Sequence, residues 1–158
     1  MRLHVSLPGY EDLSVELNDQ GEILEYHLQS SSVTMELFES LLGRYGRKIA
    51  QWQLAMVLSS AASLEERRAF YLLGELIAKA RVRWELPYAG SMVCNCRQVT
   101  SEQIDHAVVA GAMDVADVSS WTTACTSCTS CRAKIEDIIK FRAELADQLL
   151  SLTKVKRV

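Results

Sequence analysis

The sequence lacks the features that mark membrane proteins, nucleic-acid binders and disordered chains. No segment approaches the roughly 20 apolar residues that span a bilayer, and the first residues lack the long apolar stretch of a secretory signal. Its 17 Lys/Arg and 20 Asp/Glu are spread evenly, without the basic face of a nucleic-acid binder. Apolar residues make up 49% of the chain, too many for disorder. We therefore expect a globular, cytoplasmic protein.

Residues with reactive side chains are scarce in the first part of the chain. Residues 1–90 contain no cysteine, and their two histidines, His4 and His27, are expected on the surface of strands. No catalytic residue is evident, so we do not expect an enzyme. All five cysteines lie between positions 94 and 131. In a reducing compartment, such crowding indicates metal ligands or redox groups more than structural disulfides.

Alternating apolar residues predict three strands at the start of the chain. The alternation runs through Leu3–Leu7, Leu13–Leu17 and Leu24–Leu28, and it places every second residue of each run on one apolar face. Pro8-Gly9 separates the first two runs and Asn18–Gly21 the last two, and both segments are typical of tight turns. We therefore expect a three-stranded antiparallel sheet.

Helical periodicity follows the strands. Three helices are predicted: from Val33 until Gly43 and Gly46 break the run, from Lys48 to Leu58, and from Ser63 to a point before Pro87. Ser63 and Glu66 have the spacing of a capping box at the start of the third helix. The breaker segment Leu86–Ser91 then predicts a domain boundary. We assign an α+β domain to residues 1–88, a second domain to 91–152 and a basic tail to 153–158.

The second domain is predicted to be all helical, which makes the whole chain α+β. Three helices are expected: one after Thr100, which forms a capping box with Gln103, one over Asp114–Ser119, and one from Ala133 to about Leu152 with Arg142 on its inner side. The cysteines would then occupy the loops that precede helices.

The cysteines form two close pairs. Cys94-x-Cys96 is followed after 31 residues by Cys128-x-x-Cys131, and Cys125 lies three residues ahead of Cys128. Thiolates favour zinc, copper(I) or iron-sulfur clusters, and four of them are the usual complement of a 2Fe-2S cluster, one pair to each iron. A structural zinc site would use the same four cysteines, and a 4Fe-4S cluster would use Cys125, Cys128 and Cys131 with one upstream cysteine. A dithiol oxidoreductase is disfavoured because the thioredoxin-like context is missing.

The neighbours of the cysteines suit an anionic cluster. Cys96 lies ahead of the helix that starts near Ser101, and Cys131 lies at the start of the last helix, where backbone N–H groups and the helix dipole favour negative charge. Small polar residues surround the second pair: Thr126, Ser127, Thr129 and Ser130. They permit hydrogen bonds to sulfur, which tune a reduction potential.

The stretch Val93–Thr100, together with Cys128-Thr129-Ser130-Cys131 after the 31-residue gap, resembles the bacterioferritin-associated ferredoxin family of 2Fe-2S domains. Related domains occur in NifU-type scaffold proteins and some nitrite reductases. The resemblance covers about residues 92–150 and implies a small BFD-like domain. It implies a 2Fe-2S cluster held by these four residues: Cys94, Cys96, Cys128 and Cys131. The family often has glycines around its second pair, where this chain has threonines and serines.

Residues 1–90 are faintly similar to the scaffold domain of NifU-type proteins but lack its cysteines. That similarity implies a docking surface or a homodimer interface in this domain. The leading functional hypothesis is one-electron transfer to or from a redox partner protein. The alternatives are cluster assembly or regulation of the NifU type, with a protein partner for assembly, and a structural four-cysteine zinc domain.

Five other residues near the cysteines allow two interpretations each. Cys125 is expected to be a packed small side chain, with a spare ligand or resolving thiol as the alternative. Trp121 is expected to pack in the core and shield the cluster, with a partner contact as the alternative. His106 is expected to be an exposed helical residue rather than a ligand. Arg97 and Arg132 would either screen the charge of the cluster or lie in solvent.

Overall fold

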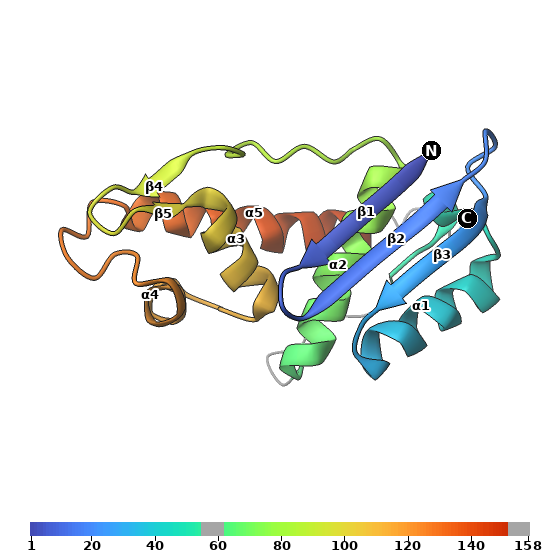
Figure 1. The fold of residues 1–158 in the computed structure, drawn as a ribbon, viewed down its shortest axis with the longest axis horizontal. Coiled ribbons are helices and arrows are strands. Elements are labelled where there is room, and N and C mark those ends of the chain that lie inside the picture. Colours follow the sequence, from blue (N-terminus) through green and yellow to red (C-terminus); the bar gives the residue numbers. More distant parts are fainter. Residues whose placement is uncertain (55–61, 152–158) are drawn as a thin grey trace. The chain divides into compact units, whose positions relative to one another are not determined.

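The computed structural model describes residues 1–54 and 62–151, with side chains described up to residue 145, and has an α+β fold (Figure 1). Two compact units make up the chain. The first is Met1–Trp84 together with the chain from Ala146, and the second is Glu85–Leu145. No helix in the described part of the chain is long and apolar enough to span a membrane.

The first unit contains the predicted antiparallel sheet. Its strands are β1 (Arg2–Leu7), β2 (Glu11–Leu17) and β3 (Ile23–Gln29), paired in the order β1-β2-β3. The predicted turns join them: Gly9 has a φ of +81°, and the side-chain oxygen of Asn18 accepts the backbone N–H groups of Gln20 and Glu22, both at 2.9 Å. Local turn chemistry therefore determines the connections of this sheet. His4 and His27 are exposed, as predicted.

The inward face of β3 differs from the prediction. Leu24 is 53% exposed, whereas Ile23 is only 1% exposed and lies opposite Leu17. The pairing of β2 with β3 shifts between Glu16 and Leu17, so that Leu24 has no partner on β2. This bulge places Ile23, instead of Leu24, on the buried face. The strand was predicted correctly, but Ile23 and not Leu24 is the buried residue at its start.

Among the described residues between the sheet and Trp84, two helices and one 3-10 turn are present. The first helix, α1 (Ser32–Tyr45), contains Gly43, so that glycine does not break the helix, and ends at Gly46 with a φ of +72°. The predicted helix Lys48–Leu58 is wrong over its described part: only the 3-10 turn η1 (Ile49–Gln51) forms, and residues 55–58 lie outside the described residues.

Trp52 explains why the 3-10 turn stops early. Its indole N–H donates to the carbonyl of Gly46 at 2.8 Å, and its ring packs edge-on against Phe38 with centroids 5.0 Å apart. The backbone at Trp52 is extended, so burial of this large side chain takes precedence over helix continuation. The third predicted helix, α2 (Leu64–Ala80), has the expected capping box of Ser63 and Glu66.

The second unit is not all helical. Its elements are β4 (Met92–Cys94), β5 (Val99–Thr100), α3 (Ser101–Ala110), α4 (Val115–Thr122) and α5 (Arg132–Ser151). β4 and β5 pair as a short antiparallel hairpin with Cys94 opposite Val99. Val93 and Val99 are buried in the core of this unit, so the hairpin forms where two β-branched residues are covered by the helices.

The three predicted helices of this unit are present. The capping box of Thr100 and Gln103 starts α3, the side chain of Asp114 caps α4, and α5 begins one residue earlier than predicted. Leu152, the predicted end of the last helix, and the basic tail 153–158 lie outside the described residues.

A buried ion pair joins α3 to α5. Both oxygens of Asp105 accept N–H groups of Arg142 at 2.7 Å, and the hydroxyl of Tyr88 lies 3.3 Å from the same carboxylate. The two charged side chains are almost fully buried. The sequence pattern placed Arg142 on the inner side of its helix but gave no sign of its partner.

Candidate metal centre

The structure brings the two cysteine pairs together at one end of the second unit. Cys94 ends β4, Cys96 lies in the turn before β5, and Cys128 and Cys131 lie in the loop between α4 and α5. The sulfurs of Cys96 and Cys128 are 2.8 Å apart, and the side chains of Cys94 and Cys131 are hydrogen-bonded. The loops that carry the pairs are therefore adjacent, although 31 residues separate them in sequence.

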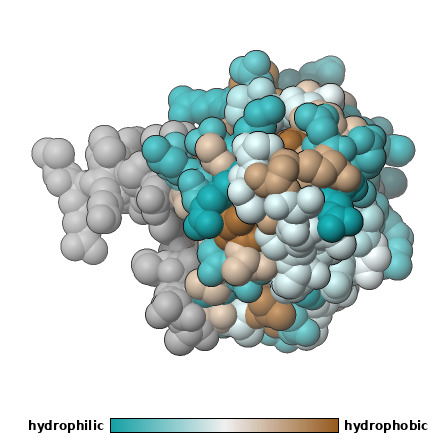
Figure 2. All heavy atoms as spheres, turned by 90° about the vertical axis from the view of Figure 1, so that its left-hand side faces the viewer, coloured by the Kyte–Doolittle hydropathy of each residue, from teal (hydrophilic) through white to brown (hydrophobic). Residues whose placement is uncertain are grey.

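One thiol of each pair is buried and the other is exposed. Cys94 and Cys131 are 2% and 4% exposed and belong to the core of the unit, whereas Cys96 and Cys128 lie at the surface. All five cysteines are free thiols. Figure 2 views this end of the second unit, where hydrophilic and neutral residues surround scattered hydrophobic ones. The site thus has a covered side and an open side.

The thiol contacts join cysteines from different pairs. The sequence predicted that Cys94 and Cys96 would serve one iron and Cys128 and Cys131 the other, but the contacts are Cys96 with Cys128 and Cys94 with Cys131. In the described residues, no group of three or more His, Cys, Asp or Glu side chains is arranged so that it could hold a metal ion. The sulfurs come together as two contacting pairs.

Backbone N–H groups point at Cys94. Hydrogen bonds from the N–H groups of Cys125 and Arg97 lower the pKa of the Cys94 thiol, the bond from Cys125 having the larger effect, while burial opposes them. Donors of this kind stabilise negative charge on sulfur. They fit a cysteine that holds a metal as a thiolate.

The two exposed thiols are hydrogen-bonded to each other. The hydrogen bond between Cys96 and Cys128 raises the pKa of Cys96, and it is the main cause that lowers the pKa of Cys128 to about 7. The Ser130 hydroxyl, 3.2 Å from the Cys128 sulfur, and the Ser130 backbone N–H contribute to the same lowering of the Cys128 pKa. Of the four thiols, Cys128 is therefore the one most readily ionised near neutral pH.

Cys131 has the opposite environment. Burial is the main cause that raises its pKa to about 11, and the neighbouring thiols of Cys94 and Cys125 contribute to the same increase. The sequence predicted that the N-terminus of the last helix would favour a thiolate here, and Cys131 does directly precede α5. Loss of hydration on burial outweighs that effect at Cys131.

The loops of the site contain residues in the left-handed backbone region. Gln98, Thr123, Cys125 and Thr129 all have a φ between +55° and +64°. A side chain with a Cβ rarely adopts this conformation, and a β-branched threonine does so least readily. These are positions where glycine would be unstrained. The conformation is therefore held by the surroundings of each residue.

The remaining predicted residues have mixed outcomes. Cys125 is half-buried against the core of the unit, as expected of a packed side chain, and its sulfur also contacts Cys131. Trp121 is 47% exposed, so the prediction of core packing is wrong. Arg97 donates to the hydroxyl of Thr126 at 3.2 Å, and its side chain therefore links the two cysteine loops.

Arg132 and His106 have no described role at the sulfurs. Arg132 pairs with Glu136 at 3.0 Å on the exposed surface of α5. His106 lies half-buried on α3 instead of fully exposed as predicted. Sequence reasoning did not single out the Ser130 hydroxyl or the Cys125 N–H as donors to particular sulfurs, although the small polar loop predicted bonds of this kind.

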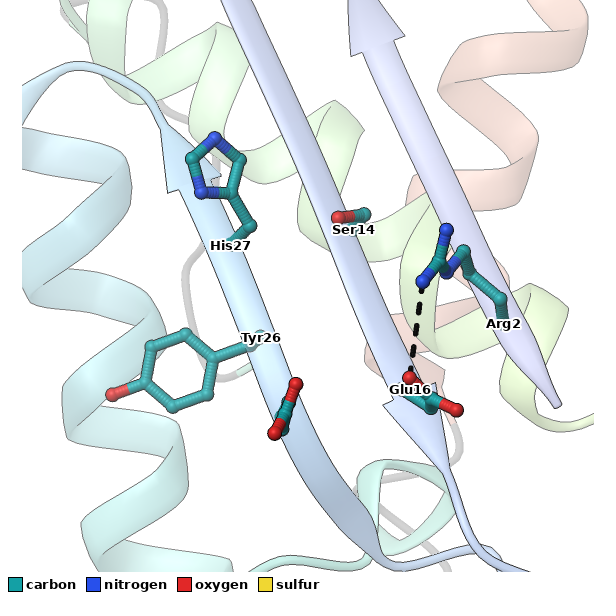
Figure 3. Close-up of a pocket in the computed structure, with 6 residues that line it drawn as sticks. Arg2, Ser14, Glu16, Tyr26 and His27 are labelled. Carbon is teal, nitrogen blue, oxygen red and sulfur yellow. Dashed lines mark ion pairs between the residues drawn. The ribbon is translucent and has the colours of Figure 1, made fainter.

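A shallow polar hollow lies on the sheet of the first unit (Figure 3). It is lined by Arg2, Ser14, Glu16, Glu25, Tyr26 and His27. Arg2 and Glu16 form an exposed ion pair at 3.8 Å, and such pairs contribute little energy. The hollow contains no cysteine and no buried charge, so we do not assign it to the metal centre.

Comparisons with known proteins agree with the location of the site. Residues 92–140 match the family model described as BFD-like [2Fe-2S] binding domain. The match contains both cysteine pairs and covers less than half of the chain. It identifies this segment as a BFD-like domain and its cofactor as a 2Fe-2S cluster. No curated protein and no solved structure matches the chain.

Proposed function

We propose that this chain is a one-electron transfer protein, in which Cys94, Cys96, Cys128 and Cys131 hold the cluster and a redox protein exchanges electrons with it. The 2Fe-2S cluster supplies one-electron chemistry when it is bound. The observation that carries the proposal is the exposure of Cys96 and Cys128 beside the buried Cys94 and Cys131. Two buried ligands anchor the group, and two exposed ones give a partner protein a short path to it.

The surroundings of the sulfurs support this proposal. Hydrogen bonds from Cys125 and Arg97 lower the pKa of Cys94, and those from Ser130 contribute to the lowered pKa of Cys128, so negative charge on these sulfurs is stabilised. We also propose that the protein is not an enzyme, because electron exchange with a partner protein requires no substrate chemistry. The family match favours the cluster over the alternative of a structural zinc site.

A second function, cluster transfer or sensing, is favoured by the left-handed residues of the loops. Thr123, Cys125 and Thr129 occupy conformations that cost energy. The surroundings of the loop hold these conformations at an energetic cost, so the ligand loop is less stable than one with glycines at the same positions. This would make the cluster easier to release than in a relative with glycines there.

The test is an anaerobic purification followed by metal analysis and a redox titration. We expect about two irons and two sulfides per chain. We also expect a reversible one-electron reduction, after which reoxidation restores the visible spectrum. One zinc and no visible absorption would contradict the cluster. A cluster that dissociates on reduction, and that appears in an added apo-ferredoxin, would favour transfer over electron transport.

A further inference from the structure

Ser130 lies beside the sulfur of Cys128, between the two cysteines of the second pair. Its Oγ is 3.2 Å from that sulfur, and its backbone N–H also donates to it. A cysteine that holds iron is a thiolate and has no proton to give, so the hydroxyl must be the donor. One residue therefore supplies two hydrogen bonds to one sulfur.

The backbone of Thr129 gives Ser130 this position. Thr129 has a φ of +57°, and its carbonyl accepts the N–H of Arg132 at 3.2 Å. This turn brings the chain back on itself between Cys128 and α5. Because threonine adopts a positive φ only at a cost, the turn is a specific feature of the loop and not a relaxed one.

We propose that the Ser130 hydroxyl is a positioning residue that raises the reduction potential of the metal centre through its hydrogen bond to the Cys128 sulfur. The inference rests on the proposed one-electron function. An added electron increases the negative charge on the ligand sulfurs, and an O–H donor stabilises that charge more in the reduced state than in the oxidised state. Removal of the hydroxyl should therefore favour the oxidised state.

The exposed position of the bond limits its effect. Cys128 and Ser130 both lie at the surface, so water can replace part of the lost hydrogen bond. We expect the equilibrium constant for reduction to fall about three- to fivefold in Ser130→Ala, which is about 30–40 mV for a one-electron couple. The backbone N–H remains in the variant and retains the rest of the stabilisation.

The experiment compares three variants of the full-length, cluster-loaded protein. Ser130→Ala should keep its iron and sulfide content and have a lower potential. Ser130→Thr keeps a hydroxyl and should keep the potential of the unmodified protein. Ser127→Ala is the matched control, because Ser127 is an exposed serine of the same loop that is not bonded to a cysteine sulfur in the described structure; its potential should not change.

Two results would overturn the inference: an unchanged potential in Ser130→Ala, or an equal shift in Ser127→Ala.

If the unmodified protein cannot be reduced reversibly, the electron-transfer proposal fails by itself. The Ser130 bond is then tested in the oxidised protein by the visible sulfur-to-iron charge-transfer bands. Loss of a donor raises the energy of the sulfur lone pairs, so these bands should move to longer wavelength in Ser130→Ala and not in Ser127→Ala. Unmoved bands would contradict the contact.

Discussion

Among single residues, the cysteines of the second pair have the most different environments. Cys128 is exposed and accepts several hydrogen bonds, which lower its pKa to about 7, whereas Cys131 is buried and has a pKa raised to about 11. Ionisation of a thiol must precede metal binding. Of these two thiols, Cys128 therefore reaches the thiolate form that a metal ligand needs more readily near neutral pH.

Substitution of single cysteines by serine tests the proposed ligands. Each of Cys94→Ser, Cys96→Ser, Cys128→Ser and Cys131→Ser should lose or strongly weaken the cluster, because a hydroxyl is a harder and far less acidic ligand than a thiol. The measurement is iron content and the visible spectrum of each purified variant. Because metal binding and folding are coupled in small metal domains, helix content should fall together with colour.

Cys125→Ser is the control in this series and should keep iron and colour. Its hydrogen bond to the Cys94 sulfur comes from the backbone N–H, which the substitution leaves in place. A Cys125→Ser variant that loses the cluster, together with a Cys128→Ser or Cys131→Ser variant that keeps it, would show that the ligand assignment is wrong.

Among elements, the end of α4 illustrates how a left-handed residue limits stability. Thr123 ends this helix with a φ of +64°, and its N–H donates to the carbonyl of Ser119 at 2.9 Å. Glycine is preferred at this position because it has no Cβ. Thr123→Gly should stabilise the second unit by about 0.5–1 kcal/mol, the relief of strain less the entropy that glycine gains on unfolding.

Chemical unfolding of the cluster-loaded protein, monitored by circular dichroism, would measure this change. Thr123→Ala keeps a Cβ but removes the branch and should give a smaller gain. If glycine destabilises the unit more than alanine does, the left-handed conformation is not strained and the explanation fails.

The ion pair between α3 and α5 gives a larger expected effect. Asp105→Ala would leave the buried guanidinium of Arg142 without its carboxylate and should destabilise the protein by about 3–5 kcal/mol. The double variant Asp105→Leu/Arg142→Met should recover much of this loss, because it removes both buried charges of this pair. Both changes would be measured as the free energy of unfolding in urea.

An exposed pair on the same helix is the matched control. Lys140 and Glu144 are 3.6 Å apart at the surface of α5, so Glu144→Ala should change the free energy of unfolding by about 0.5 kcal/mol or less. Equal losses in Asp105→Ala and Glu144→Ala would show that burial does not determine the strength of the Asp105–Arg142 pair.

The same elements show what could be predicted from the sequence. The capping boxes at Ser63 and Thr100 were found because their partners lie three residues away. The bulge that places Ile23 inside β3, and the hairpin that ends at Cys94, were missed because both depend on residues distant in sequence. Cysteine spacing predicted which thiols approach one another as a group, but their individual contacts depend on how the loops fold.

At the scale of the whole molecule, the second unit begins before the first cysteine pair. The compact unit starts at Glu85, earlier than the predicted start at residue 91. Tyr88 packs edge-on against Phe141 with centroids 5.4 Å apart and bonds to Asp105. The N–H of Gly90 donates to Glu102 at 2.6 Å. These contacts hold the segment before β4 against α3 and α5.

A fragment of residues 85–151 should therefore hold the cluster without the first unit, because every cysteine and the contacts of Tyr88 and Gly90 remain. A fragment that begins at residue 91 lacks those contacts, and we expect it to lose its cluster several times faster to an iron chelator. The decay of visible absorbance measures both rates. Tyr88→Phe in the longer fragment keeps the ring against Phe141 but removes the hydroxyl, so its rate should lie between the two.

A colourless, unfolded 85–151 fragment would contradict the prediction, because the first unit would then be needed to complete the site. Equal rates for the two fragments would instead show that the segment before β4 does not support the cysteine loops.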